Sequence, residues 1–239
     1  MSSALSGFDD WLNRMLERCA HDAGESVNAY VTRAVATQMV ADQRRAESNS
    51  IEELMEHLAE CGALAATEMP DVKAEINNPQ RLRALYATGL LDTAPEELYD
   101  RITRAAAAAL DTPAASLTLV DADRQFFKST VGMKIESPQD RQTPLPRSVC
   151  QYAVASAAPL VLDDARVDPV FKNHPAVVDG MVVAYLGIPL IDGDGNAIGT
   201  LCVFDSRPRM WGTGHVQVLS DLAKLAVERI FSSVPDSRS

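Results

Sequence analysis

The chain has 239 residues, which is enough for one large domain or for a medium domain with a smaller attachment. Apolar residues make up 46% of the chain, so a hydrophobic core can form, which argues against global disorder. The net charge of -11 repels phosphate backbones and anionic membranes, which argues against binding to nucleic acids or to membrane surfaces.

The sequence predicts a cytoplasmic protein without a membrane partner. The longest apolar run, residues 181–191, is too short to cross a bilayer. We expect no signal peptide at the start, because no basic segment is followed there by an apolar and then by a small-residue segment. Four cysteines are widely spaced and form no C-x-x-C pair, which predicts neither a disulfide framework nor a metal site; they are Cys19, Cys61, Cys150 and Cys202.

Helical periodicity dominates the beginning of the chain. Apolar residues recur at helical spacing in two stretches that a glycine separates. After a polar break, Ser50 and Glu53 make a capping box that predicts a third helix. We therefore expect an all-helical segment over residues 1–46, followed by a linker helix over residues 47–75.

The pattern changes after the linker helix, and we expect a second domain over residues 76–234. A short helix is predicted for residues 78–89, because Gly89 is suited to a C-terminal cap. A longer helix is predicted to open with a capping box of Thr93 and Glu96.

Strand patterns follow, and a long helix closes the domain. The predicted strands form two hairpins and one short strand between them; they cover residues 115–121, 125–132, 159–164, 182–191 and 197–205. No helix alternates regularly with these strands, as a parallel sheet would require. The sequence therefore predicts an α+β fold: an antiparallel sheet with helices on one face, a loop-and-helix cap on the other, and an all-helical N-terminal segment.

Several stretches of residues 79–232 follow one another in a distinctive order: "RLRALYATGLLDTAPEELYDRIT", "ASLTLVDADRQFFKSTVG", "SVCQYAV", "PLVLDDARVDPVFKNHPAV" and "AYLGIPLIDGDGNAIGTLCVFD". Through these stretches and their order, residues 79–232 resemble a GAF domain of the bacterial signalling type. The resemblance implies a regulatory domain with a small-molecule pocket between the sheet and residues 140–180. It also implies dimerisation through terminal helices.

A second resemblance covers residues 8–46, whose helices are similar to those of ribbon-helix-helix proteins, above all in "GESVNAYVTRAV". The basic strand of that family has no counterpart here, and residues 1–48 hold five Arg against seven Asp and Glu. Since DNA recognition needs cationic donors, we expect this segment to serve dimerisation rather than specific DNA binding.

Cys150 is the main candidate for chemistry. It stands at a predicted helix start close to Arg147, which would favour a thiolate. The resemblance implies one enzymatic alternative, a free methionine-(R)-sulfoxide reductase, in which Cys150 would attack and Cys202 would close a disulfide. The other interpretation makes Cys150 a small residue in the pocket wall. We favour the wall and assign no catalytic residue.

Further residues are expected to line the ligand pocket. Phe126 and Phe127 face opposite sides of a strand, so only one of them can reach it. An acid of the loop after the short strand is a candidate, and His174 is expected in an exposed loop. The predicted ligand-binding residues are Phe127, Cys150, Asp164, Phe171, Tyr185 and Cys202. The sequence leaves the cofactor and the ligand unidentified, and the residue set typical of cyclic-nucleotide GAF domains is not visible.

The closing helix carries two apolar stripes, one suited to cover the sheet and one left for a partner. The sequence thus favours a sensory or regulatory homodimer that binds a small ligand and signals through its helices to a downstream protein. Two alternatives stay open. One is a redox enzyme using Cys150, and the other is a ligand-gated transcription regulator using the N-terminal helices.

Overall fold

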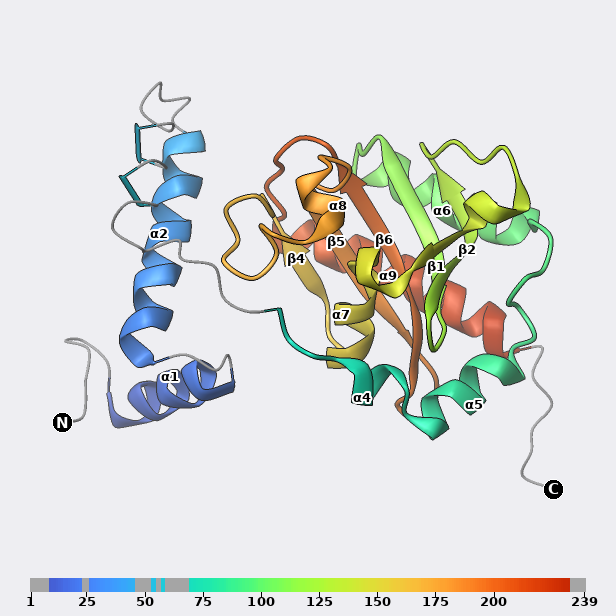
Figure 1. The fold of residues 1–239 in the computed structure, drawn as a ribbon, viewed down its shortest axis with the longest axis horizontal. Coiled ribbons are helices and arrows are strands. Elements are labelled where there is room, and N and C mark those ends of the chain that lie inside the picture. The colour runs from blue at the N-terminus through green and yellow to red at the C-terminus, as the bar shows by residue number, and fades with distance from the viewer. Residues whose placement is uncertain (1–8, 23–25, 46–52, 55–56, 59–68, 233–239) are drawn as a thin grey trace. The chain divides into compact units, whose positions relative to one another are not determined.

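The computed structural model describes residues 9–22, 26–45, 53–54, 57–58 and 69–232. The chain divides into two compact units, one built chiefly from residues 1–67 and the other from residues 68–166 and 171–239 (Figure 1). Each unit has its own buried core, so each is described separately.

The N-terminal unit is helical where it is described. Helices α1 (Asp10–Asp22) and α2 (Val27–Arg45) occupy the two predicted stretches, and the Asp9 carboxylate accepts from the Leu12 N–H at 2.8 Å, which caps the first of them. Its buried apolar residues are Ala36, Val40 and Leu58. Of the predicted third helix, residues 53–54 and 57–58 are helical, whereas Ser50 of its predicted capping box lies outside the described residues.

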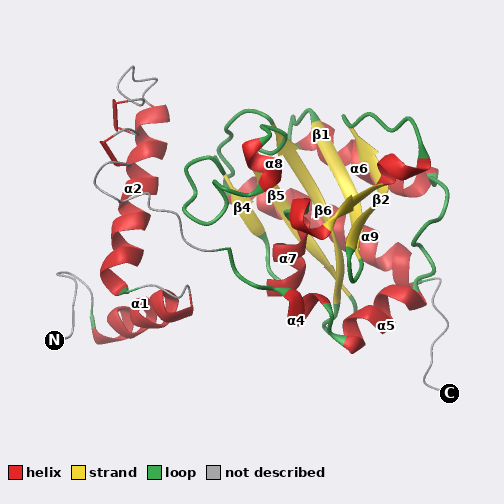
Figure 2. Ribbon diagram, viewed as in Figure 1, coloured by secondary structure: helices red, strands yellow, loops and turns green. Residues whose placement is uncertain are grey.

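The second unit is built on a six-stranded antiparallel sheet in the order β3-β2-β1-β6-β5-β4 (Figure 2). The central strands β1 (Ala114–Val120), β6 (Ala197–Asp205) and β5 (Ala184–Ile191) are buried along almost their whole length. Two further strands flank them, β2 (Arg124–Val131) and β4 (Leu160–Leu162). This arrangement confirms the predicted α+β fold. The short edge strand β3 (Gln142–Pro144) was not predicted.

Helices α6 (Glu97–Ala109) and α9 (Thr213–Phe231) cover one face of the sheet (Figure 2). They meet the aliphatic side chains that alternate along the strands, such as Leu117 and Leu201. One stripe of α9 is buried there, as predicted; it contains Leu219, Ala223, Ala226 and Ile230. Of the other predicted stripe, Val218 and Leu225 are 40% and 50% exposed, whereas Leu222 is partly buried against the core.

The opposite face of the central strands carries small polar residues and a thiol. Ser116 and Thr118 of β1 lie opposite Cys202 and Thr200 of β6 in the strand register, and the two threonine hydroxyls are 2.9 Å apart. This face is covered by α7 (Cys150–Ser156) and by the short helices η1 (Pro138–Arg141), η2 (Leu145–Arg147) and α8 (Pro175–Val178). The predicted cap is therefore present.

The start of α6 differs from the prediction. Glu96 stands at the N-cap but makes no capping hydrogen bond, because the buried ammonium of Lys128 takes both acceptors of the predicted box. That ammonium donates to the Thr93 hydroxyl at 2.6 Å and to the Ala94 carbonyl at 2.9 Å, and it forms an ion pair with Glu96. A buried cation has to be paired. Lys128 of strand β2, and not the capping of α6, therefore sets the orientation of the Thr93 and Glu96 side chains.

Helices α4 (Lys73–Ile76) and α5 (Pro79–Ala87) precede α6. The Asn78 side chain caps α5 by accepting from two backbone N–H groups, and Gly89 follows the helix at a φ of 63°, as its predicted capping role requires. Among the described residues, no helix is both long and apolar enough to cross a membrane.

Candidate functional site: a cavity with two thiols

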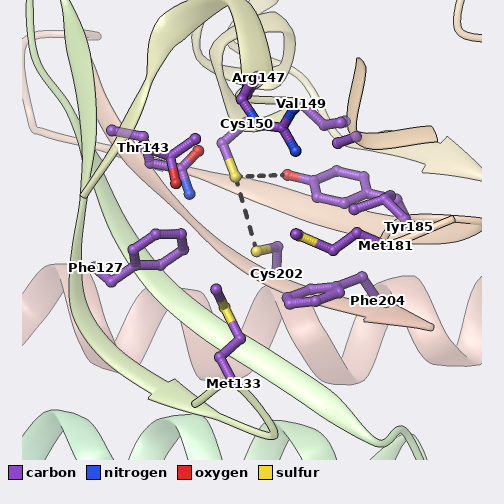
Figure 3. Close-up of a pocket in the computed structure, with 13 residues that line it drawn as sticks. Phe127, Met133, Thr143, Arg147, Val149, Cys150, Met181, Tyr185, Cys202 and Phe204 are labelled. Carbon is purple, nitrogen blue, oxygen red and sulfur yellow. Dashed lines mark hydrogen bonds between the residues drawn. The ribbon is translucent and has the colours of Figure 1, made fainter. Parts of the chain in front are cut away.

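A cavity of about 100 Å³ lies between the polar face of the sheet and the segments that cover it (Figure 3). Strands β2, β5 and β6 supply the floor, and η2, α7 and the residues around α8 supply the walls. The lining residues are Gln125, Phe127, Met133, Thr143, Arg147, Val149, Cys150, Ala176, Met181, Val182, Tyr185, Cys202 and Phe204.

The two cysteines of the cavity face each other (Figure 3). Cys150 comes from the first turn of α7 and Cys202 from the middle of β6, and their Sγ atoms are 3.9 Å apart. Both residues are buried thiols. A disulfide needs about 2.05 Å between the sulfur atoms, so the pair is close enough to share a proton but is not bonded.

Tyr185 reaches the same sulfur from β5. Its hydroxyl donates to Cys150 Sγ at 3.3 Å, and its ring is fully buried. Gly187 makes this orientation possible, because a Cβ atom at that position would lie 2.3 Å from the Tyr185 hydroxyl oxygen. The glycine therefore lets the phenol lie along the sheet, where its hydroxyl meets the thiol.

The thiols titrate differently because of this environment. A hydrogen bond with Cys202, supported by the hydroxyls of Thr200, Tyr185 and Thr118, lowers the pKa of Cys150 to about 6 against the opposing effect of burial. The pKa of Cys202 is raised well above its ordinary value, first by its hydrogen bond to Cys150 and then by burial. The hydrogen bonds thus favour ionisation of Cys150 over ionisation of Cys202, and the two thiols titrate as a coupled pair.

Tyr185→Phe is expected to raise the pKa of Cys150, because it removes one donor to the thiolate. Ultraviolet thiolate absorbance followed against pH measures the shift, and Tyr86→Phe, at an exposed position of α5, is the control. The folded pKa of about 6 lies below the ordinary 9.0. The free energy of unfolding of the wild type is therefore expected to rise with pH between these values. The stabilisation that comes from the Cys150 thiolate is lost as the pH falls through about 6.

A flat stability profile over that range in the wild type, or equal titration curves for Tyr185→Phe and wild type, would contradict the assignment. Cys202 contributes in the opposite direction, since its folded pKa is raised. Its contribution is present at lower pH and is lost only as the pH rises through that elevated value.

An ion pair closes part of the cavity rim. Arg147 of η2 bonds to Asp179, which follows α8, and both side chains are more than 40% exposed. Met181, two residues after Asp179, is 50% exposed although it lines the cavity. Because exposed ion pairs contribute only about 0–1 kcal/mol, little free energy holds α8 against η2 at this point.

Four of the predicted ligand-binding residues line the cavity together: Phe127, Cys150, Tyr185 and Cys202. Phe126, the neighbour of Phe127, instead packs in the core on the helix side, as the alternation of the strand requires.

The other two predicted residues, Asp164 and Phe171, are placed elsewhere. The Asp164 carboxylate is held by Arg166, whose Nε and Nη2 donate to it at 2.9 and 2.8 Å. Phe171 packs edge-on against Tyr152, with ring centroids 5.2 Å apart. Both residues order the loop between β4 and α8, and neither is part of the cavity lining.

His174 is also corrected. It is 2% exposed and not part of an exposed loop, because its Nδ1 accepts from the Ala176 N–H at 3.2 Å and caps α8. Burial is the main cause that lowers the pKa of His174, and it favours the neutral form of the side chain.

The other residues that line the cavity were not predicted, although the sequence contains one pattern that marks the face of the sheet beneath the cavity. In residues 116–118 and 200–202, small polar or sulfur-containing residues alternate with leucines. Period-two alternation places Ser116, Thr118, Thr200 and Cys202 on one face, which marks it as the side without an aliphatic core. The residues contributed by loops, such as Met133 and Met181, have no comparable pattern.

Comparison with known proteins fits this architecture. The GAF domain family matches residues 94–230. A Pseudomonas aeruginosa protein named as a cyclic di-GMP phosphodiesterase is 34% identical over 144 residues, which are 59% of this chain and 24% of that protein. The chain therefore spans about a quarter of the length of this relative.

Two solved structures are similar as well. A GAF sensor protein from Burkholderia vietnamiensis is 18% identical, with a TM-score of 0.47 over 69% of this chain and 99% of that one. A free methionine-R-sulfoxide reductase from Neisseria meningitidis is 18% identical, with a TM-score of 0.47 over 71% of this chain and 96% of that one. Since the family match spans more than half of the sequence, this chain belongs to the GAF domain family.

Proposed function

We propose that this protein is a sensory or regulatory GAF protein that binds a small ligand in the cavity and transmits its occupancy to a partner. The observation that carries the proposal is the cavity itself, where polar groups converge on a largely apolar space beside two thiols. Such a pocket, with a few fixed polar groups in an apolar lining, is typical of small-molecule sites.

The size of the cavity restricts what it admits. Its 100 Å³ is below the range of about 300–1,000 Å³ typical of ligand pockets. A ligand of more than a few heavy atoms therefore requires α8 and the residues after it to move away from η2. The weak Arg147–Asp179 ion pair at the rim is the contact that such an opening would break first.

Strand β6 connects the cavity to the helices on the other face. Cys202 and Phe204 line the cavity, whereas Leu201 and Val203 belong to the core that α6 and α9 cover. A ligand that displaces one face of β6 thus changes the packing under α9. The Pseudomonas relative supports a regulatory role, because it combines its similar region with a much longer chain named for a phosphodiesterase.

Native mass spectrometry of freshly purified protein tests ligand binding. The wild type is expected to retain a small molecule, and Ala176→Phe is expected to lose it, because the ring fills the cavity from a wall that is 3% exposed. Val161→Phe, at a 41% exposed position of β4, is the control and should retain the molecule. Equal occupancy in Ala176→Phe and wild type would place the ligand elsewhere.

We expect a homodimer in which the exposed stripe of α9 contributes to the interface, since an apolar stripe on a soluble protein marks a partner surface. Leu225→Glu is expected to shift the dimer toward monomer, because burying an unpaired carboxylate at an interface is costly. Sedimentation equilibrium measures the shift. Met210→Glu, also at an exposed apolar position, should leave the dimer intact.

One observation favours a second candidate, a thiol reductase of sulfoxides. With 3.9 Å between the sulfur atoms, Cys150 could attack a sulfoxide sulfur, and Cys202 could then form the disulfide while thioether and water leave. We expect neither the wild type nor Cys150→Ser to turn over free methionine-(R)-sulfoxide with a thiol reductant. Turnover by the wild type that is lost in Cys150→Ser would replace the sensory proposal with the enzymatic one.

A further inference from the structure

Four sulfur atoms surround one cavity. The thiols of Cys150 and Cys202 are joined there by the thioethers of Met133 and Met181, which come from the loops after β2 and after α8 (Figure 3). The four residues are far apart in the sequence, and the folded sheet brings them to the same site.

Met133 lies close to the thiol pair. Its sulfur is 3.8 Å from the Ser116 hydroxyl oxygen, and Ser116 is the direct partner of Cys202 in the β1–β6 register. Partners of an antiparallel pair have Cβ atoms only about 5 Å apart. The Met133 thioether is therefore a neighbour of the Cys202 thiol.

The chemistry of this lining selects one type of ion. The lining residues include no carboxylate and no imidazole, so magnesium and calcium would lack the oxygen ligands they need. In the described part of the chain, no three His, Cys, Asp or Glu side chains gather as a metal site, whereas structural zinc takes four such ligands. Thiolate and thioether sulfurs suit monovalent copper.

We propose that Cys150 and Cys202 bind one Cu⁺ ion at the floor of the cavity, with Met133 and Met181 as neighbouring thioether ligands. Binding requires both sulfurs to be thiolates, so the protons that the two thiols carry are released to solvent as Cu⁺ binds. The Tyr185 hydroxyl, 3.3 Å from Cys150 Sγ, orients that sulfur as an outer partner of the ion.

The cavity also offers a route for the ion. The thiols are buried, with 4% and 2% of the two cysteines exposed, whereas Met181 is 50% exposed. Met181 thus gives the cavity a soft ligand that solvent can reach, from which copper could pass to the buried thiols. This inference goes beyond the proposed function, since it requires neither an organic ligand nor a signalling partner.

The test is an anaerobic competition for Cu⁺ between the reduced full chain and bathocuproine disulfonate, with thermal unfolding recorded for each variant. The wild type is expected to withdraw one copper ion per chain from the chelator. Cys150→Ser and Cys202→Ser are each expected to weaken binding about a hundredfold or more, and Met133→Leu and Met181→Leu about tenfold.

The matched control removes the other two cysteines of the chain. The double variant Cys19→Ser/Cys61→Ser should still bind one ion with unchanged affinity. X-ray absorption at the copper edge of the wild type provides a readout that needs no variant, and it should show only sulfur in the first shell.

Three results would overturn the proposal: copper that stays with the chelator, binding that survives in Cys150→Ser and Cys202→Ser, or nitrogen and oxygen in the first shell. A retained organic molecule together with any of these results would leave the sensory proposal standing. Copper binding in a protein that retains no organic molecule and forms no dimer would support the copper site and contradict the sensory proposal.

Discussion

Replacing Arg81 with leucine is expected to lower the free energy of unfolding by about 4 kcal/mol, because it removes a buried guanidinium that joins three segments. Arg81 is 4% exposed. Its Nε donates to the Ile76 carbonyl at 2.8 Å, and its Nη1 donates to the Val120 carbonyl at 2.7 Å. Hydrogen bonds from charged groups each contribute about 1.5–3 kcal/mol, and leucine would leave both buried carbonyls without this donor.

Arg83→Leu is the matched control, since Arg83 lies on the same helix α5 but is exposed. The melting temperature is expected to fall by about 10 °C in Arg81→Leu and to change little in the control. Calorimetry and urea unfolding measure both variants. Equal shifts would show that the guanidinium does not connect α4, α5 and the end of β1 as the geometry indicates.

Gly199→Ala is expected to destabilise the second unit by about 3 kcal/mol, because the centre of the sheet has no room for a methyl group. A Cβ atom at Gly199 would lie 1.9 Å from the Thr118 carbonyl oxygen on β1. The obstacle is backbone and not the flexible end of a side chain, so β1 and β6 would have to separate where Leu119 pairs with Gly199.

Gly193→Ala provides the control from the turn between β5 and β6. A Cβ atom there meets nothing within 4 Å, and the backbone is not in the left-handed region. This variant should be neutral or slightly more stable, because alanine reduces the entropy of the unfolded chain. Urea unfolding of the two variants checks the prediction, which fails if Gly199→Ala is as stable as Gly193→Ala.

The sequence by itself determined the class of the fold and the order of its elements. Period-two alternation located the strands of both hairpins, and helical periodicity located α9 with its buried and exposed stripes. These patterns are local, since each depends on a face that the chain repeats every two or every three to four residues. The family resemblance added the side of the sheet on which to seek a pocket. Of the six residues predicted for that pocket, four line the cavity: Phe127, Cys150, Tyr185 and Cys202.

Only the tertiary structure decided which distant side chains meet. Nothing local predicts that Cys150 and Cys202 lie 3.9 Å apart, because that distance depends on the docking of α7 over β6. The burial of Lys128 redirected Thr93 and Glu96 away from the predicted capping box. Asp164 is held by Arg166 and Phe171 packs against Tyr152, so both serve the loop. A one-dimensional pattern gives the face on which a residue stands, whereas its partner is set by sheet register and loop packing.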